Sequence, residues 1–327
     1  MALLVFTIIE APDYGWAAPR SVAGFAASAV LLTAFIVRER TAAHPMLDVR
    51  LFRNMRFSPA SAAVTVSFFT LFGFIFLMTQ YFQFVRGYGP LSAGVHLLPV
   101  ALSVGAGSVA GTQLAVRAGT KLIVTTGLVA MAAFYGWVAV TTSATLSYGI
   151  IAVQMVLYGL GLGLTSAPAT ESIMGAISRA KAGVGSAVND STRLIGGTLG
   201  VAVIGSVYAS VYGSRLTATM PASVPGPVAA IAHQSVGAAY VAAGKIAALG
   251  HPVLGQALQH ASASAFLRAL TVGCLIAGAV AAVGALLAVL FLPAQPARPA
   301  SPAADEAGTP EGRRVAQTPA HPASAAR

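Results

Sequence analysis

The chain has 327 residues, of which 56% are apolar and only 9% are charged, and its formal net charge is +10. Soluble domains carry about 25% charged residues, so a water-soluble fold could not cover this much apolar surface. The basic residues are dispersed among apolar runs instead of forming a stripe. This distribution argues against nucleic-acid binding as the reason for the positive net charge.

The N-terminal segment has about eight apolar residues after Met1, followed by Glu10, Ala11, Pro12 and Asp13. A signal peptide needs a basic region before its apolar run, and none is present. We therefore interpret residues 2–11 as the last part of a spanning helix whose beginning is missing, in preference to a cleaved leader.

Apolar windows of about 20 residues, bounded by charged or Pro/Gly-rich breaks, predict an all-α integral membrane protein. About seven complete transmembrane helices are expected in addition to the partial one, at residues 21–37, 58–82, 92–115, 121–142, 148–167, 184–210 and 264–292. The stretch 211–262 is too polar and too interrupted to span, and its Ala-rich part at 228–249 predicts a surface helix in a long external loop. The Pro/Ala/Ser-rich segment 293–327 is predicted to be a disordered tail.

The distribution of basic residues predicts the orientation. Thirteen of them fall in the segments 38–57, 116–121, 168–183 and 293–327, five fall in the alternate segments, and Arg193 falls within a span. Lys and Arg accumulate in cytoplasmic loops. We therefore expect a multi-pass protein of the cell (plasma or inner) membrane whose C-terminus is cytoplasmic.

Motifs of soluble enzymes are absent, since the sequence has no Walker A loop, HExxH, GxSxG or pair of carboxylates in a polar setting. We expect neither an enzyme nor a cofactor. Cys274 is the single cysteine and lies in an apolar segment, so it offers neither a disulfide nor a metal cluster and is interpreted as a core residue.

Two groups of glycines lie within spans. Gly159 and Gly163 belong to a run that superficially resembles a nucleotide loop, but its place within a span favours close helix packing. Gly196 and Gly200 have GxxxG spacing and predict a packing face, with a hinge or rocking surface as the alternative.

Charged side chains inside spans are costly and usually face a bundle interior or water. The candidate gate or translocation-path residues near the cytoplasmic boundary are Glu171, Asn189, Asp190 and Arg193. Asp190 and Arg193 are three residues apart and can pair on one helix face. They either lock or cap the helix ends or form a gate or substrate-facing site.

The remaining candidates are dispersed along the spans. Gln154 is a polar residue within a span, and His96 could carry protons near neutral pH or could be a hydrogen-bonded packing histidine. Pro99 and Pro168 are expected to bend or break their helices.

Several motifs, in order along the chain, resemble the fourteen-span drug:proton antiporters of the major facilitator superfamily. They cover Phe35–Arg40, His44–Asp48, Leu51–Asn54, Gln80–Gln83, Gly87–Gly94, Leu97–Pro99, Pro168–Thr170, Ala182–Asp190 and Arg193–Gly197. The resemblance implies export of hydrophobic or amphipathic small molecules coupled to inward proton flow.

The resemblance also implies a domain organisation. Residues 1–57 correspond to the linker spans and a cytoplasmic loop, residues 58–292 to the six-span C-terminal half, and residues 293–327 to a tail, so an N-terminal six-span half is the expected missing partner. The cytoplasmic turn that holds Arg117 and Lys121 departs from the family pattern, because Val116 stands where an Asp is usual. A salt bridge at that turn is therefore not expected.

Two hypotheses follow from the sequence. The first is a secondary transporter of the multidrug-exporter type, present as a C-terminal portion. The alternative is a non-transporting membrane component, which is either the partner of a separate N-terminal half or an inactive remnant.

Overall fold

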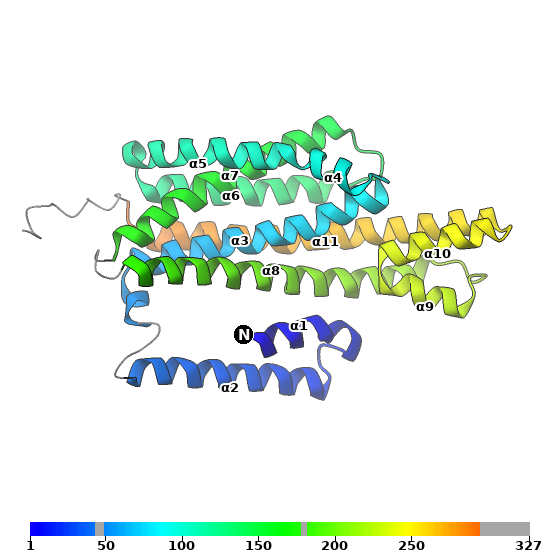
Figure 1. Cartoon of the computed structure of the whole chain (residues 1–327), viewed down its shortest axis with the longest axis horizontal. Helices are drawn as coiled ribbons and strands as arrows, with labels where there is room; N and C mark the ends of the chain where they lie inside the picture. The colour runs from blue at the N-terminus through cyan, green and yellow to red at the C-terminus, as the bar shows by residue number, and fades with distance from the viewer. Residues whose placement is uncertain (43–48, 178–181, 295–327) are drawn as a thin grey trace, which may run out of the picture. The chain divides into compact units, whose positions relative to one another are not determined.

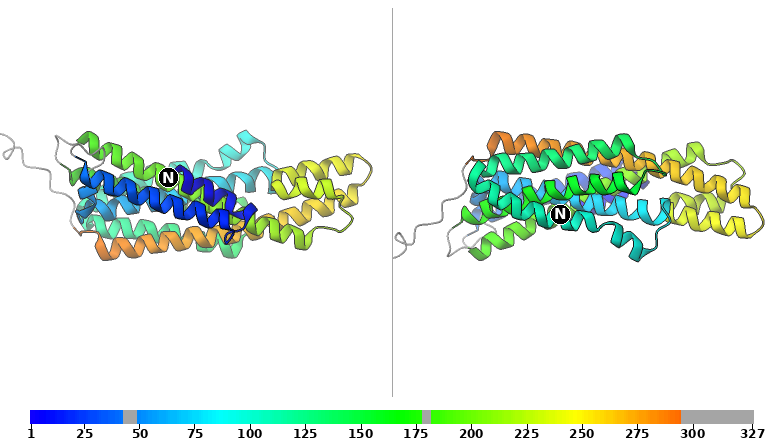
Figure 2. Two further views of the ribbon diagram at one scale, coloured as in Figure 1. Left: turned by 90° about the horizontal axis from the view of Figure 1, so that it is seen from below. Right: turned by 90° about the horizontal axis from the view of Figure 1, so that it is seen from above.

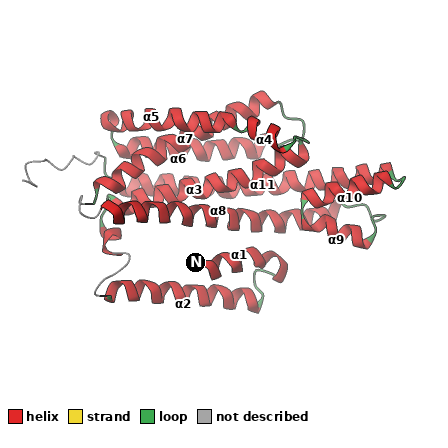
Figure 3. Cartoon of the chain, in the orientation of Figure 1, coloured by secondary structure: helices red, strands yellow, loops and turns green. Residues whose placement is uncertain are grey.

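The computed structural model describes residues 1–42, 49–177 and 182–294, and in these ranges the chain is built from helices and loops without strands (Figure 3). Within them, seven helical segments are long and apolar enough to cross a membrane, which confirms the predicted fold class. They are α2 (Pro19–Thr41), α3 (Phe57–Gln80) with the π-helical turn η2 (Tyr81–Val85), α4 (Pro90–His96) with α5 (Leu98–Ala118), α6 (Thr120–Thr141), α7 (Tyr148–Gly175), α8 (Ala182–Thr219) and α11 (Pro252–Phe291).

Helix α3 lies at the centre of the bundle and packs against α7, α8 and α11 (Figure 1). Helix α6 fills the space between α7 and α11, and α5 covers α7. Buried rings of Phe74, Phe134, Tyr135 and Tyr158 meet where α3, α6 and α7 converge. Both tyrosine hydroxyls are satisfied at Thr70, since Tyr135 donates to its carbonyl at 2.6 Å and Tyr158 to its hydroxyl at 3.3 Å.

Small residues bring the helix backbones into close approach. A Cβ at Gly159 would lie 2.6 Å from the Val100 carbonyl oxygen, so α7 contacts α5 backbone to backbone. Cβ atoms at Gly196 and Gly200 would collide with backbone carbonyls of α3. Because apolar surface gives no net drive for association in lipid, such close packing is a main source of helix affinity there.

The N-terminal helix α1 (Ala2–Tyr14) packs on α8 and α2, and Ser206 of α8 donates a hydrogen bond to the carbonyl of Ile8. At 13 residues it is about 20 Å long, shorter than the ~30 Å hydrocarbon core. Helix α2 packs against α1 and the 3₁₀ turn η1 (Val49–Arg53), and only 11% of its most apolar window is buried. Most of its surface is therefore available to lipid.

The stretch predicted as a long loop is mostly helical. Helix α8 continues to Thr219, two short helices follow as α9 (Gly226–Gln234) and α10 (Val236–Ala248), and α11 begins at Pro252 (Figure 2). The predicted surface helix at 228–249 is broken at Ser235, whose hydroxyl accepts from the Ala238 amide and caps α10.

The polarity of this stretch reflects helix length instead of loop structure. Helix α11 has 40 residues and is about 60 Å long, twice the hydrocarbon core. Its first part packs against α10, which buries small residues such as Ala239 and Ala243. Some of the sequence predictions concern segments outside the described residues. These are the predicted tail at 293–327, of which only the first two residues are described, the motif His44–Asp48, and the basic residues Arg179 and Lys181.

Candidate functional site

A polar cluster joins the end of α7 to the beginning of α8. Arg193 donates from Nη2 to the hydroxyl of Thr170 at 3.2 Å, and that hydroxyl lies 3.5 Å from Oδ1 of Asn189. Asn189 is 5% exposed, and its carbonyl accepts from the hydroxyl of Thr192 at 2.7 Å. Arg193 Nε is buried and has no hydrogen-bond partner within the described residues.

An aromatic ring of α3 completes the surroundings of Arg193. The guanidinium carbon lies 5.1 Å from the centroid of Phe68, a cation–π distance. One turn further along, Phe72 lies against Gly197 of α8 and is 40% exposed, and Ile75 is 43% exposed. Positions 68, 72 and 75 are three or four residues apart and form one face of α3.

The two carboxylates predicted beside this cluster do not bind the guanidinium. Glu171 and Asp190 are exposed, and neither forms an ion pair with Arg193 in the described part of the chain. Arg193 bonds to a hydroxyl on α7 instead of to the carboxylate one turn before it on α8. Within the described residues, the structure thus brings Asn189 and Arg193 together at Thr170 and leaves Glu171 and Asp190 outside this cluster.

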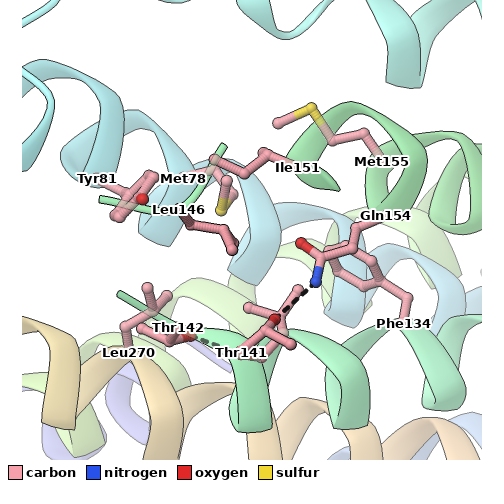
Figure 4. Close-up of a pocket in the computed structure, with 11 residues that line it drawn as sticks. Met78, Tyr81, Phe134, Thr141, Thr142, Leu146, Ile151, Gln154, Met155 and Leu270 are labelled. Carbon is pink, nitrogen blue, oxygen red and sulfur yellow. Dashed lines mark hydrogen bonds between the residues drawn. The ribbon is translucent and has the colours of Figure 1, made fainter. Parts of the chain in front are cut away.

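Gln154 lies at a separate site, a small pocket between α3, α6, α7 and α11 (Figure 4). Its side-chain nitrogen donates to the hydroxyl of Thr141 at 2.9 Å, and the surrounding walls include Met78, Phe134 and Leu270. The cavity measures about 20 Å³, room for about one water molecule. Drug-sized ligands occupy about 300–1,000 Å³, so this pocket does not hold a drug in the state described.

His96 lies at the opposite end of the bundle from Arg193, in an aromatic cluster at the end of α4. Its ring centroid is 4.4 Å from Tyr88 and 4.6 Å from Tyr148, and its Nδ1 donates to the carbonyl of Ser92 at 2.7 Å. The hydroxyl of Tyr148 donates to the His96 carbonyl at 3.2 Å. These contacts hold the ring between α4 and the start of α7.

The two candidate prolines have different positions. Pro99 occupies the first turn of α5, just after the break between α4 and α5 at Leu97. Pro168 is buried inside α7, which continues without a break to Gly175. Of the turn residues, Arg117 is exposed and Lys121 is half-buried, and Gly119 between them has φ 91° and lies against the Ala294 carbonyl.

Gly163, one turn after Gly159 on α7, also lies against the backbone of α5. A Cβ there would lie 2.5 Å from the carbonyl oxygen of Val104 and 2.5 Å from the amide nitrogen of Ser108. Only a hydrogen in place of the methyl group allows α5 and α7 to lie this close.

Sequence reasoning missed Phe68 and Thr170 as neighbours of Arg193, and Phe72 as the neighbour of Gly197. Residues 68, 72 and 75 are spaced as one helix face, but α3 is mostly apolar and its Ser and Thr residues are spread around the helix, so no polarity contrast marks this face. Thr170 belongs to the motif Pro168–Thr170 that resembles the antiporter family, yet nothing in that motif shows which side chain Thr170 would bind.

In the part of the chain that the structure describes, seven long apolar helices pack through small residues, and a polar cluster around Arg193 lies between two of them, which is the architecture of a multi-pass membrane protein. The sequence profile of the Major Facilitator Superfamily matches residues 3–201, more than half of the chain, and the chain belongs to this family.

Its relatives include proteins named for drug resistance and efflux. The chain is 32% identical over 225 residues to the multidrug resistance protein Stp of Mycobacterium tuberculosis, covering 69% of this chain and 42% of the relative. It is 31% identical over 289 residues to the tetracenomycin C resistance and export protein of Streptomyces glaucescens (86% and 53%), and 30% identical over 285 residues to the multidrug efflux pump LfrA of Mycolicibacterium smegmatis (87% and 56%). The chain spans about half the length of these relatives.

Proposed function

We propose that this chain forms the C-terminal part of a secondary transporter that exports hydrophobic or amphipathic small molecules. The observation that carries the proposal is the similarity to export and efflux proteins, which extends over 86% and 87% of the chain for two of them. The transport is coupled to inward proton flow, as the motifs of the sequence imply. A protein of this kind performs no covalent chemistry on its substrate.

The translocation path forms between this bundle and a second six-span half. Two observations support this: the tetracenomycin C export protein and LfrA are about twice as long as their matched segments, and the interior pocket beside Gln154 holds about 20 Å³. Substrate sites of such transporters lie at the interface of two repeats. The polar cluster of Thr170, Asn189 and Arg193 then lies on the wall of that path, with Glu171 and Asp190 as gate residues at its cytoplasmic end.

The experiment compares the chain alone with the chain supplied with an N-terminal six-span half from a relative such as LfrA, either fused in frame before Met1 or co-expressed. Vesicles with an imposed proton gradient are loaded with a fluorescent amphipathic dye, and dye movement is recorded with and without an uncoupler. We expect no uncoupler-sensitive movement with the chain alone and restored movement with both halves.

Strong proton-driven transport by the chain alone would contradict the need for a second half. An immunoblot of the membrane fraction shows whether the native product is longer than this chain, and such a product is tested in the same assay. If neither the two halves together nor the longer product moves dye, the result favours the second candidate function, a non-transporting membrane component.

A further inference from the structure

The guanidinium of Arg193 has hydrogen-bonding capacity that the chain does not use. It carries five N–H donors, and the described residues supply one acceptor, the hydroxyl of Thr170. Its Nε is buried without a hydrogen-bond partner among the described residues, and the guanidinium carbon lies 5.1 Å from the centroid of the Phe68 ring. Charged side chains within spanning helices are costly and usually pair with an opposite charge or face water, so the unused donors of Arg193 favour an anionic partner.

An apolar surface continues directly from this cation. Phe68 touches the guanidinium, Phe72 follows one turn later against Gly197, and Ile75 comes next on the same face of α3. Phe72 and Ile75 are exposed in the described structure. The cation therefore lies at one end of an apolar strip, a pattern that complements a molecule with one acidic end and an apolar body.

We propose that Arg193 is a specificity-determining residue that binds the oxyanion of an amphipathic acid, a carboxylate or a sulfonate, whose apolar body lies along Phe68, Phe72 and Ile75. Planar guanidinium groups bind such oxyanions through two parallel hydrogen bonds. Thr170 holds the guanidinium in place from α7. This inference rests on the proposed function, because it names the class of substrate that the transporter accepts.

The same oxyanion chemistry is available from a lipid phosphate. Arginine side chains near the ends of spanning helices reach toward the headgroups, and an anionic lipid would offer two oxygens in the same geometry. The experiment therefore measures binding in nanodiscs of neutral lipid and in nanodiscs that contain phosphatidylglycerol.

The experiment titrates 1-pyrenebutanoate, and its cationic trimethylammonium analogue, into nanodiscs that hold the full chain, with empty nanodiscs as the blank. The variants are Arg193→Gln, Arg193→Lys and Arg215→Gln, the last being an exposed arginine on the same helix. In neutral lipid we expect Arg193→Gln to weaken binding of the acid about tenfold, Arg193→Lys to weaken it less, and Arg215→Gln to leave it unchanged. Binding of the cationic analogue does not weaken in any variant.

Equal affinity of wild type and Arg193→Gln for the acid, or equal weakening of both probes, would overturn the proposal. Loss of acid binding to wild type in nanodiscs that contain phosphatidylglycerol would also overturn the proposal, because the oxyanion at Arg193 would then belong to a lipid. A thermal unfolding midpoint within a few degrees of wild type shows that a variant is folded. The variant Phe72→Leu provides a second readout, because it should weaken binding of the acid while Arg193 stays intact. Binding of the acid can be measured without transport. A chain that binds the acid through Arg193 but moves no dye even when supplied with an N-terminal half would therefore support this inference and contradict the proposed transport function.

Discussion

Gly196 and Gly200 lie where α8 crosses α3, and each faces a backbone carbonyl of the partner helix, those of Thr65 and Phe69. Neither carbonyl can move without disturbing its own helix. A methyl group at these positions therefore separates the two helices along their contact, and the van der Waals contact that holds helices together in lipid is lost.

We expect Gly200→Ala to destabilise the bundle by about 1–3 kcal/mol, the range typical of overpacked cores. The measurement is thermal unfolding of the purified chain in detergent. Gly205→Ala on the same helix is the matched control, because the nearest atom to its Cβ is on the Phe76 ring at 3.7 Å, an ordinary contact. A melting temperature for Gly200→Ala equal to that of Gly205→Ala would show that the α3–α8 contact is looser than described.

At the scale of elements, the turn η2 holds the loop between α6 and α7. Arg86, which follows η2, donates to the carbonyls of Ala144 at 3.1 Å and Leu146 at 2.9 Å. The hydroxyl of Tyr81 donates to the carbonyl of Ser143 at 2.8 Å. The end of α3 thus fixes a loop about 60 residues away in sequence.

Replacing Arg86 with Ala removes two of these bonds, each worth on the order of 1 kcal/mol or less because the side chain is near solvent. We expect faster hydrogen exchange at the amides of residues 143–147 and little change in the global melting temperature. Arg20→Ala is the control, since Arg20 contacts Tyr14 and lies on α2, apart from this loop. Unchanged exchange at the loop in Arg86→Ala would mean that Tyr81 alone holds it.

At the scale of the whole bundle, the ends of the long helices test the orientation of the chain. The end of α2 and the turn between α10 and α11 lie at opposite ends of the bundle (Figure 1). Thr41 is the last residue of α2, and Leu249 follows α10. Leu249 is 78% exposed, Thr41 is also exposed, and the single native cysteine, Cys274, is 3% exposed. Cysteines introduced at the two exposed positions report which side each occupies.

With a membrane-impermeant maleimide on intact cells, we expect Leu249→Cys to be labelled and Thr41→Cys to be labelled only after the membrane is opened. The unaltered chain, with Cys274 alone, provides the background and stays unlabelled. Labelling of Thr41→Cys in intact cells would reverse the orientation inferred from the basic residues.

The sequence by itself determined the class of the protein and the approximate location of its long apolar helices, because hydrocarbon accepts only apolar runs of a set length with internally bonded backbones. It also marked Arg193, Asn189 and Gln154 as unusual, since polar groups in lipid are rare. Only the tertiary structure decided which groups these residues meet. In a mostly apolar helix, polarity does not show which face packs inward. Thr170 and Phe68 as the partners of Arg193, and Thr141 as the partner of Gln154, could therefore be found only by packing the helices together.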